Sequence, residues 1–357
     1  MPHSFDLLVL GDANPDVVVG PLDDPLAFGQ REQLVSDGAL TLGGSAAIMA
    51  CGAARLGLRV ALAGRVGDDE AGHFVRDALT ARGVDTAALR MDPALPTPLT
   101  VVVTRGGRGG DRAVLTSPGT LAATSGQDIP RGMLTSVRHV HAASYFLMPR
   151  LAAALPELLL TARCHGATTS LDTNDDPAGR WDPDGLPAVY AATDFLLPNA
   201  AEAMALAGPD GDEPGRAAAL LAARGPVTVV KNGADGALAH DGRALLHTRG
   251  PVVAPRDTVG AGDSFDAGFV AATLAGLPLP EALRLAAVCG ALSTRAPGGT
   301  PAQPTWEEAR ATAAPLRPAT PVAPATTAPP GAPEPPPATA GSPAPAENRT
   351  APDRKNA

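Results

Sequence analysis

The sequence predicts an α/β protein built as a doubly wound αβα sandwich, in which helices cover both faces of a parallel sheet and a small antiparallel β-sheet is added as a lid. Two observations indicate this class. Short β-rich runs alternate with helical patterns over most of the 357 residues, and two β-rich stretches at 16–42 and 97–117 interrupt the alternation. The first pattern is typical of strands joined by helical crossovers. The second favours a small sheet that covers a ligand at the carboxyl ends of the core strands.

Six short runs supply the expected core strands. They lie at 5–11, 58–64, 137–143, 167–172, 194–199 and 226–231. After the second run, Phe74, Val75, Ala78 and Leu79 fall on one stripe at helical spacing, which predicts an amphipathic helix. Strand and helix therefore follow each other as a parallel sheet requires.

The two lid segments contain runs such as DVVVG and LTVVVT, separated by Gly, Pro and Asp, with no helix of useful length between them. We expect one folded domain at 1–314 that carries both segments. From 315 to 357 the chain is rich in Pro, Ala and Thr and poor in large apolar residues, so this tail is expected to be disordered.

Composition excludes several classes of partner. The formal net charge is −9, aromatic residues make up 3% of the chain, and lysine occurs only at Lys231 and Lys355, which argues against binding to nucleic acid or anionic membranes. The three cysteines show neither metal-ligand nor disulfide spacing. The acidic N-terminus lacks an export pattern, and the apolar stretch at 151–160 is too short to cross a bilayer. We expect a cytoplasmic protein without a membrane span.

The segment DTVGAGDSFDAGF (257–269) is expected to be a loop that enters a helix. Gly260, Ala261 and Gly262 would leave backbone N–H groups uncovered at the positive end of the helix, which suits a phosphate. Asp263, in the first turn, can accept the proton of an attacking hydroxyl. The alternative is that Asp263 only caps the helix and the glycines only form a turn.

Further motifs occur in a fixed order with this one: GGSAAIMACGAARLG, GRVGDDEAGHFVRDALTARGVDT, PNAAEA and VVKNGADGAL. Together they resemble the ribokinase-like, or PfkB-type, family of carbohydrate kinases, from about Asp6 to Thr305. The resemblance implies a kinase that uses ATP and Mg²⁺ to phosphorylate a hydroxyl of a ribose-, fructose- or ketodeoxygluconate-like sugar. Two alternatives are a nucleoside kinase of the same family and a catalytically silent sugar-binding regulator.

The family motifs imply roles for particular residues around the phosphates. They imply that Asp263 is the catalytic base and that Gly260, Ala261 and Gly262 form the anion hole. Around the nucleotide and Mg²⁺ they place Asn199, Glu202, Lys231 and Gly233, with Glu202 acting on the ion through water. Asp257 matches a residue beside which some relatives bind K⁺. Glu202 as a solvated helix residue and Lys231 as a charged strand end remain alternatives.

On the acceptor side the motifs imply contacts from Asn14, Asp16, Gly43, Gly44, Asp172 and Asn174. Asp16 would accept two hydrogen bonds from sugar hydroxyls, unless it is only a turn residue after Pro15. The sequence departs from the family at Ile48, where an asparagine usually contacts the sugar, and at Ser45, where sugar-phosphate kinases often carry lysine. Relatives often pair through their lids, so we also expect a homodimer.

Overall fold

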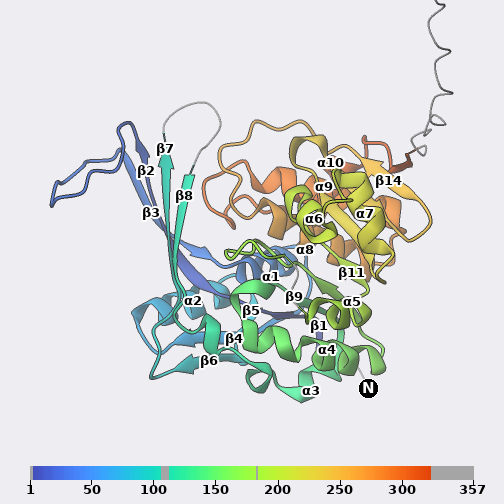
Figure 1. The fold of residues 1–357 in the computed structure, drawn as a ribbon, viewed down its shortest axis with the longest axis horizontal. Coiled ribbons are helices and arrows are strands. Elements are labelled where there is room, and N and C mark those ends of the chain that lie inside the picture. The colour runs from blue at the N-terminus through green and yellow to red at the C-terminus, as the bar shows by residue number, and fades with distance from the viewer. Residues whose placement is uncertain (1–2, 106–111, 182–183, 323–357) are drawn as a thin grey trace, which may run out of the picture. The chain divides into compact units, whose positions relative to one another are not determined.

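The computed structural model describes residues 3–105, 112–181 and 184–322. Its main sheet has the strand order β15-β14-β13-β12-β11-β10-β9-β1-β4-β5, and β6 pairs with β4 (Figure 1). In chain order the strands are β1 (Phe5–Leu10), β4 (Val60–Gly67), β5 (Val84–Asp85), β6 (Leu89–Asp92), β9 (Val137–Ala142), β10 (Thr168–Leu171), β11 (Phe195–Leu196), β12 (Val227–Lys231), β13 (Ala237–His240), β14 (Leu245–Thr248) and β15 (Thr320–Pro321). The pairs from β5 to β12 are parallel, and β13 to β15 extend the sheet in antiparallel pairs.

Helices cover both faces of this sheet. They are α1 (Ser45–Arg55), α2 (Glu70–Thr80), α3 (Arg131–Leu134), α4 (Pro149–Cys164), α5 (Leu186–Ala191), α6 (Ala200–Ala207), α7 (Pro214–Ala222), α8 (Ala261–Leu274), α9 (Leu279–Ser293) and α10 (Trp306–Ala313). Because side chains alternate along β1, Leu7 and Val9 join one buried cluster with α1, α2, α8, α9 and α10, whereas Leu8 and Leu10 join a second with α4 to α7.

The predicted fold class is confirmed. Each of the six expected runs overlaps a core strand, although β4 extends to Gly67, beyond the expected 58–64. The expected amphipathic helix is α2, which buries Val75 and Leu79. Asp69 begins this helix by accepting a hydrogen bond from the N–H of Gly72. The strands β13 to β15 were not among the predicted runs.

A separate four-stranded sheet forms the lid. Its order is β3-β2-β7-β8, with β2 at Asn14–Leu22, β3 at Asp37–Gly43, β7 at Leu99–Arg105 and β8 at Arg112–Ser117. The expectation of an antiparallel lid is wrong in one respect, because the central pair β2 and β7 is parallel. Both strands run outward from the core and lie side by side, while β3 and β8 return along the two edges (Figure 1). Residues 106–111 of the expected lid lie outside the described residues.

The C-terminal part of the described chain packs on the main sheet. Residues 315–322, which the sequence analysis assigned to the tail, include β15, which pairs with β14. The backbone oxygen of Leu316 accepts a hydrogen bond from Arg284, and Ala319 is buried, so a few small apolar contacts suffice to order this stretch. Residues 323–357 of the expected tail lie outside the described residues. Among the described helices, none is both long and apolar enough to cross a membrane.

Candidate active site

The candidate site lies at the edge of the main sheet where the parallel strands β1, β10 and β12 end and where α1 and α8 begin. Asp12 follows β1, and its carboxylate accepts the N–H groups of Ser45 at 3.2 Å and Ala46 at 3.0 Å in the first turn of α1. The helix starts from Gly44, whose φ of 89° favours glycine. Burial raises the pKa of Asp12, and these N–H groups act against that rise.

The loop before α8 has the predicted form. Gly260 is the N-cap residue with φ 71°, and a Cβ there would lie 2.6 Å from Cα of Gly299. No side chain caps this helix, so Asp263 does not play the capping role that was its alternative explanation. The first-turn N–H groups of a helix have no intrahelical partner, so the start of α8 suits an anion.

The side chain of Asp263 is buried at this helix start. Burial, and after it the neighbouring carboxylate of Asp172, raises its pKa to about 8. The ammonium of Lys231 and a hydrogen bond with Ser45 act in the opposite direction. The result is a carboxylate whose proton affinity is suited to proton transfer near neutral pH.

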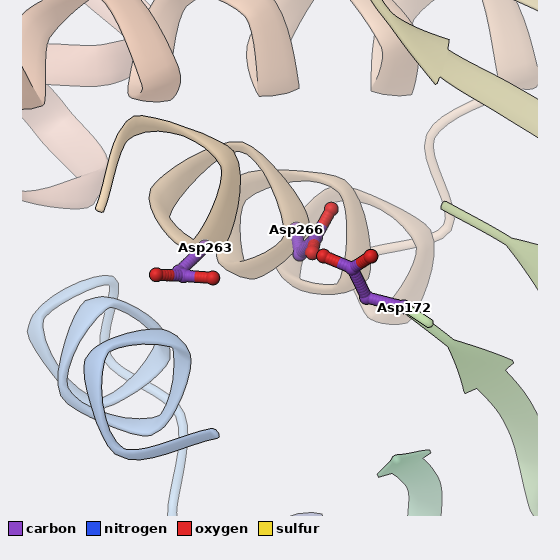
Figure 2. A group of neighbouring side chains, drawn as sticks. All are labelled: Asp172, Asp263 and Asp266. Atoms are coloured by element: carbon purple, nitrogen blue, oxygen red, sulfur yellow. The ribbon is translucent and has the colours of Figure 1, made fainter. Parts of the chain in front are cut away.

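Lys231, at the end of β12, is enclosed by carboxylates. Its Nζ lies 2.6 Å from Asp172 and 3.2 Å from Asp266, and both of these carboxylates are buried. Figure 2 shows that Asp263 and Asp266 project from α8, while Asp172 approaches from the end of β10. Oxygen atoms of these three aspartates all lie within 4.8 Å of one another.

Asn199 and Glu202 form a reciprocal cap at the start of α6. The N–H of Glu202 donates to Asn199 Oδ1 at 2.9 Å, and the N–H of Asn199 donates to Glu202 Oε2 at 2.8 Å. The Glu202 side chain is buried, so its alternative role as a solvated helix residue does not hold. Burial and the nearby Asp172 raise the pKa of Glu202 to about 7.

The expected acceptor residues also lie together. Asn14 Nδ2 donates to Asp16 Oδ1 at 2.8 Å and to Thr100 Oγ1 at 3.2 Å, so the β2 side chains are fixed against β7. Burial raises the pKa of Asp16 to about 6. A Cβ on Gly43, the cross-strand partner of Asn14, would collide with the Asp16 carboxylate.

Asn174, which follows β10, is hydrogen-bonded to the start of α1 and to the segment after β9. Its backbone has φ 54°, its N–H donates to Asp172 Oδ1 at 3.2 Å, and its Nδ2 donates to Ser45 Oγ at 2.9 Å. Its Oδ1 accepts the N–H of Ser144 at 2.7 Å. The D-x-N element is therefore joined to the start of α1, beside Asp263.

Ile48 is 3% exposed and packs against the loop before α8. Cβ atoms built on Gly260 and Gly299 would lie 2.9 Å and 2.6 Å from its side chain. Its backbone oxygen accepts a hydrogen bond from Gln303 at 2.9 Å. The side chain that replaces the family asparagine therefore supports this loop.

Asp257 and Gly233 lie at the periphery of the cluster. Asp257 accepts the N–H groups of Val259 at 3.0 Å and Gly298 at 2.8 Å, and Arg112 of the lid lies 3.9 Å away. Gly233, with φ 56°, opens a turn after β12.

A cavity of about 520 Å³ lies between the lid and this part of the core. It is lined by Val18, Gly20, Pro21, Asp37, Ala39, Thr41, Val102, Thr104, Arg112, Pro255, Arg256, Asp257, Thr258, Val259, Pro297 and Gly298. Val18, which pairs with Ala39 and Val102, is two residues after Asp16 on β2, so the two side chains lie on the same face of the lid. The cavity therefore begins next to Asp16 and extends along the lid away from the core.

Two site residues were missed by sequence reasoning. Asp12 lies in GDANPD beside two residues that were selected, and Asp266 follows Asp263 by three positions on the same helix. The spacing of the two α8 aspartates was the available signal, because residues three apart share a helix face.

Known proteins resemble this chain over most of its length. The model of the pfkB family carbohydrate kinases matches residues 4–306. The ATP-dependent ribose-1-phosphate kinase of Halopiger xanaduensis is 33% identical over 258 residues, which cover 70% of this chain and 79% of that protein. The 2-dehydro-3-deoxygluconokinase of Bacillus subtilis is 30% identical over 280 residues, covering 75% and 85%.

Solved structures show the same fold. Arabidopsis thaliana ribokinase, complexed with ribose and ATP, has a TM-score of 0.74 at 23% identity and covers 88% of this chain and 99% of its own. A PfkB protein from Polaromonas sp. JS666 has a TM-score of 0.72 at 27% identity and covers 86% and 100%. From the extent of the family match and of these relatives, the chain belongs to the pfkB family of carbohydrate kinases.

Proposed function

We propose that the protein transfers the γ-phosphoryl group of ATP to a hydroxyl of a small sugar, with Asp263 as the general base. One observation carries this proposal. The Asp263 carboxylate is buried beside the uncapped start of α8, and its pKa is raised to about 8. A carboxylate with this proton affinity can accept a hydroxyl proton where the helix N–H groups face the incoming charge.

In the proposed reaction Asp263 accepts the proton of the acceptor hydroxyl while the hydroxyl oxygen bonds to the γ-phosphorus. The bond from that phosphorus to the bridging oxygen breaks, and ADP leaves with the electron pair. The loop at Gly260, Ala261 and Gly262 places N–H groups where charge on the transferred group is stabilised. Asp263 then returns its proton to solvent.

Mg²⁺ fits the residues around Glu202. The carboxylate of Glu202 is buried, and negative charge on Asp172 and Asp175 raises its pKa, so a hydrated cation beside it would relieve repulsion. Oxygen donors suit this ion. When bound, Mg²⁺ would neutralise part of the phosphate charge, while Asn199 fixes the Glu202 carboxylate. A K⁺ ion beside Asp257 stays a prediction, and Arg112 already supplies positive charge there.

For the acceptor, we propose that Asp16 and Asn14 bind the sugar hydroxyls beneath the lid, with the backbone at Gly43 and Gly44 close to the ring. The names of the relatives support ribose-, fructose- or ketodeoxygluconate-like sugars. Ser45 argues against a phosphorylated acceptor. The first of these relatives is nevertheless named for ribose 1-phosphate, so that compound belongs in the test.

A nucleoside is the second candidate acceptor, and the lid cavity favours it. A volume of about 520 Å³ lies within the range that binds small ligands, and its walls include Val18, Val102 and Val259, against which a base could pack. Ile48 is buried against Gly299, so the valines of the cavity wall, and not Ile48, would contact the base.

We also propose a homodimer formed through the outer face of the lid. Val17 pairs with Leu40 and Val101, and Val101 pairs with Leu115, so one row of apolar side chains crosses all four strands. Leu40 and Leu115 are exposed by 56% and 58%. A second lid would cover this row. A cytoplasmic location stays a prediction.

The test is ADP release with Mg²⁺-ATP across ribose, fructose, ketodeoxygluconate, ribose 1-phosphate and adenosine. Asp263→Asn should lower kcat at least about 100-fold, because general-base catalysis typically contributes that much. Glu281→Gln is the control, since Glu281 is also in the first turn of a helix, α9, and should retain activity within about twofold. Equal rates for wild type and Asp263→Asn would refute the proposed mechanism.

A further inference from the structure

The buried ammonium of Lys231 has its donors directed at protein carboxylates. Its Nζ donates to Asp172 Oδ2 at 2.6 Å and to the two oxygens of Asp266 at 3.3 Å and 3.2 Å. The Lys231 side chain is 10% exposed, and those of Asp172 and Asp266 are 2% and 0% exposed. The ammonium is therefore shared between two buried carboxylates.

These three residues join separate parts of the site. Asp172 follows β10, Lys231 ends β12, and Asp266 lies one turn after Asp263 on α8 (Figure 2). A Cβ on Gly262 would lie 3.5 Å from the Lys231 ammonium, so this charge lies directly against the phosphate-binding turn. The cluster therefore connects the first turns of α8 to the ends of two core strands.

We propose that Lys231 is a positioning residue, which through Asp172 and Asp266 fixes the first turns of α8 and supplies the positive charge that favours ionised Asp263. This inference rests on the proposed role of Asp263. It differs from the nucleotide contact that the family motif implies for Lys231. A phosphate contact would require Lys231 to leave two buried carboxylates, and breaking a buried ion pair is strongly destabilising because it leaves a buried charge uncompensated.

The charges around Asp263 determine the direction in which Lys231 shifts the pKa of Asp263. Burial works against the charge of Lys231, but Asp172 and Asp266 more than offset it and raise the pKa of the ammonium, so it remains protonated. The titratable groups that face Asp263 or this cluster are Asp12 after β1, His141 on β9, Asp172, Glu202 on α6, Lys231 and Asp266. His141 is neutral near pH 7, because burial lowers its pKa to about 4. Lys231 is therefore the one cation among them, within the described residues.

The test compares Lys231→Met with Asp266→Asn. Lys231→Met removes the cation, so the acid limb of the pH profile of kcat should move up by about one pH unit, and kcat at pH 7 should fall about tenfold. Asp266→Asn keeps the 2.6 Å contact of Lys231 with Asp172, so its limb should stay in place or move to lower pH. The affinity for ADP, measured by calorimetry, should stay within about twofold of wild type in both variants.

Two results would overturn the inference. A tenfold or larger loss of ADP affinity in Lys231→Met would identify a nucleotide contact. An acid limb that stays in place in Lys231→Met would indicate a purely structural role. Asp266→Asn keeps the experiment informative if Lys231→Met does not fold, because an upward shift of its limb also contradicts the inference. ADP binding needs no acceptor, so failure of the proposed function would appear separately, as absent turnover with intact ADP affinity.

Discussion

The ionisation of Asp263 predicts how turnover depends on pH. The buried carboxyls of Asp16, Glu202 and Asp263 have pKa values raised to about 6, 7 and 8, in each case first by burial. Asp263 is therefore the last of the three to lose its proton. In the proposed reaction only ionised Asp263 can accept the hydroxyl proton, so kcat should rise with pH until Asp263 is fully ionised.

The size of this rise follows from the pKa. With a value of about 8, roughly 1% of the molecules carry ionised Asp263 at pH 6, roughly 10% at pH 7 and roughly 90% at pH 9. We expect kcat to increase by about 90-fold between pH 6 and pH 9. The assay is initial ADP release at saturating Mg²⁺-ATP and acceptor, at constant ionic strength.

Asp263→Asn provides the control for this profile, because it removes the titrating group without changing the size of the side chain. Residual activity in Asp263→Asn should lack the limb near pH 8. A wild-type profile that is flat between pH 6 and 9, or one that is half-maximal below pH 5, would refute the reasoning, since burial would then not set the proton affinity of the base.

Four further predictions concern single features. Gly43→Ala should raise KM for the acceptor at least about tenfold and leave KM for ATP unchanged, because the added Cβ collides with the Asp16 carboxylate. The control is Gly38→Ala on the same strand, whose added Cβ would meet no atom closer than 4.0 Å, so this variant should behave as wild type. Ile48→Asn should lower the free energy of unfolding in urea by about 2 kcal/mol or more, and an unchanged midpoint would contradict its tight packing. Leu115→Asp should convert a dimer to monomers in sedimentation while Val252→Asp, at a fully exposed site, should not, and a monomeric wild type would remove the idea. Because folding raises the pKa of Asp263, protonated Asp263 stabilises the fold fully below about pH 4, and this contribution is lost as the pH rises through about 8. The free energy of unfolding of wild type should therefore decline between these pH values, and Asp263→Asn should show a smaller decline.

Local patterns in the sequence were sufficient to predict the layered fold and the helix start at Asp263. The core strands are short, β1 and β4 are largely apolar, and the glycines before α8 have few alternatives to a turn, so neighbouring residues determine these features. The pairing of β2 with β7 depends on two segments about 80 residues apart that both leave the core in the same direction. No local pattern encodes that relation.

The partners of charged side chains were equally hidden in the sequence. A lysine at the end of a strand can bind either a phosphate or a carboxylate, and the local sequence does not distinguish the two. The ion pairs of Lys231 with Asp172 and Asp266 form only in the folded protein. Ile48 could have faced an acceptor, but α1 turns it onto Gly260 and Gly299. Sequence motifs selected the candidate residues, whereas tertiary packing determines which of them contact one another.

The cap that Asp12 supplies to α1 has a consequence for selectivity. Several helices begin at this edge of the sheet, among them α1 and α8, and the start of a helix attracts an anion. An internal carboxylate already fills the start of α1, whereas the start of α8 carries no side-chain cap. An anion is therefore favoured at the start of α8, whereas Asp12 already occupies the N–H groups at the start of α1. In the proposed reaction, this asymmetry favours the phosphate of the donor at α8 and an uncharged part of the acceptor at α1.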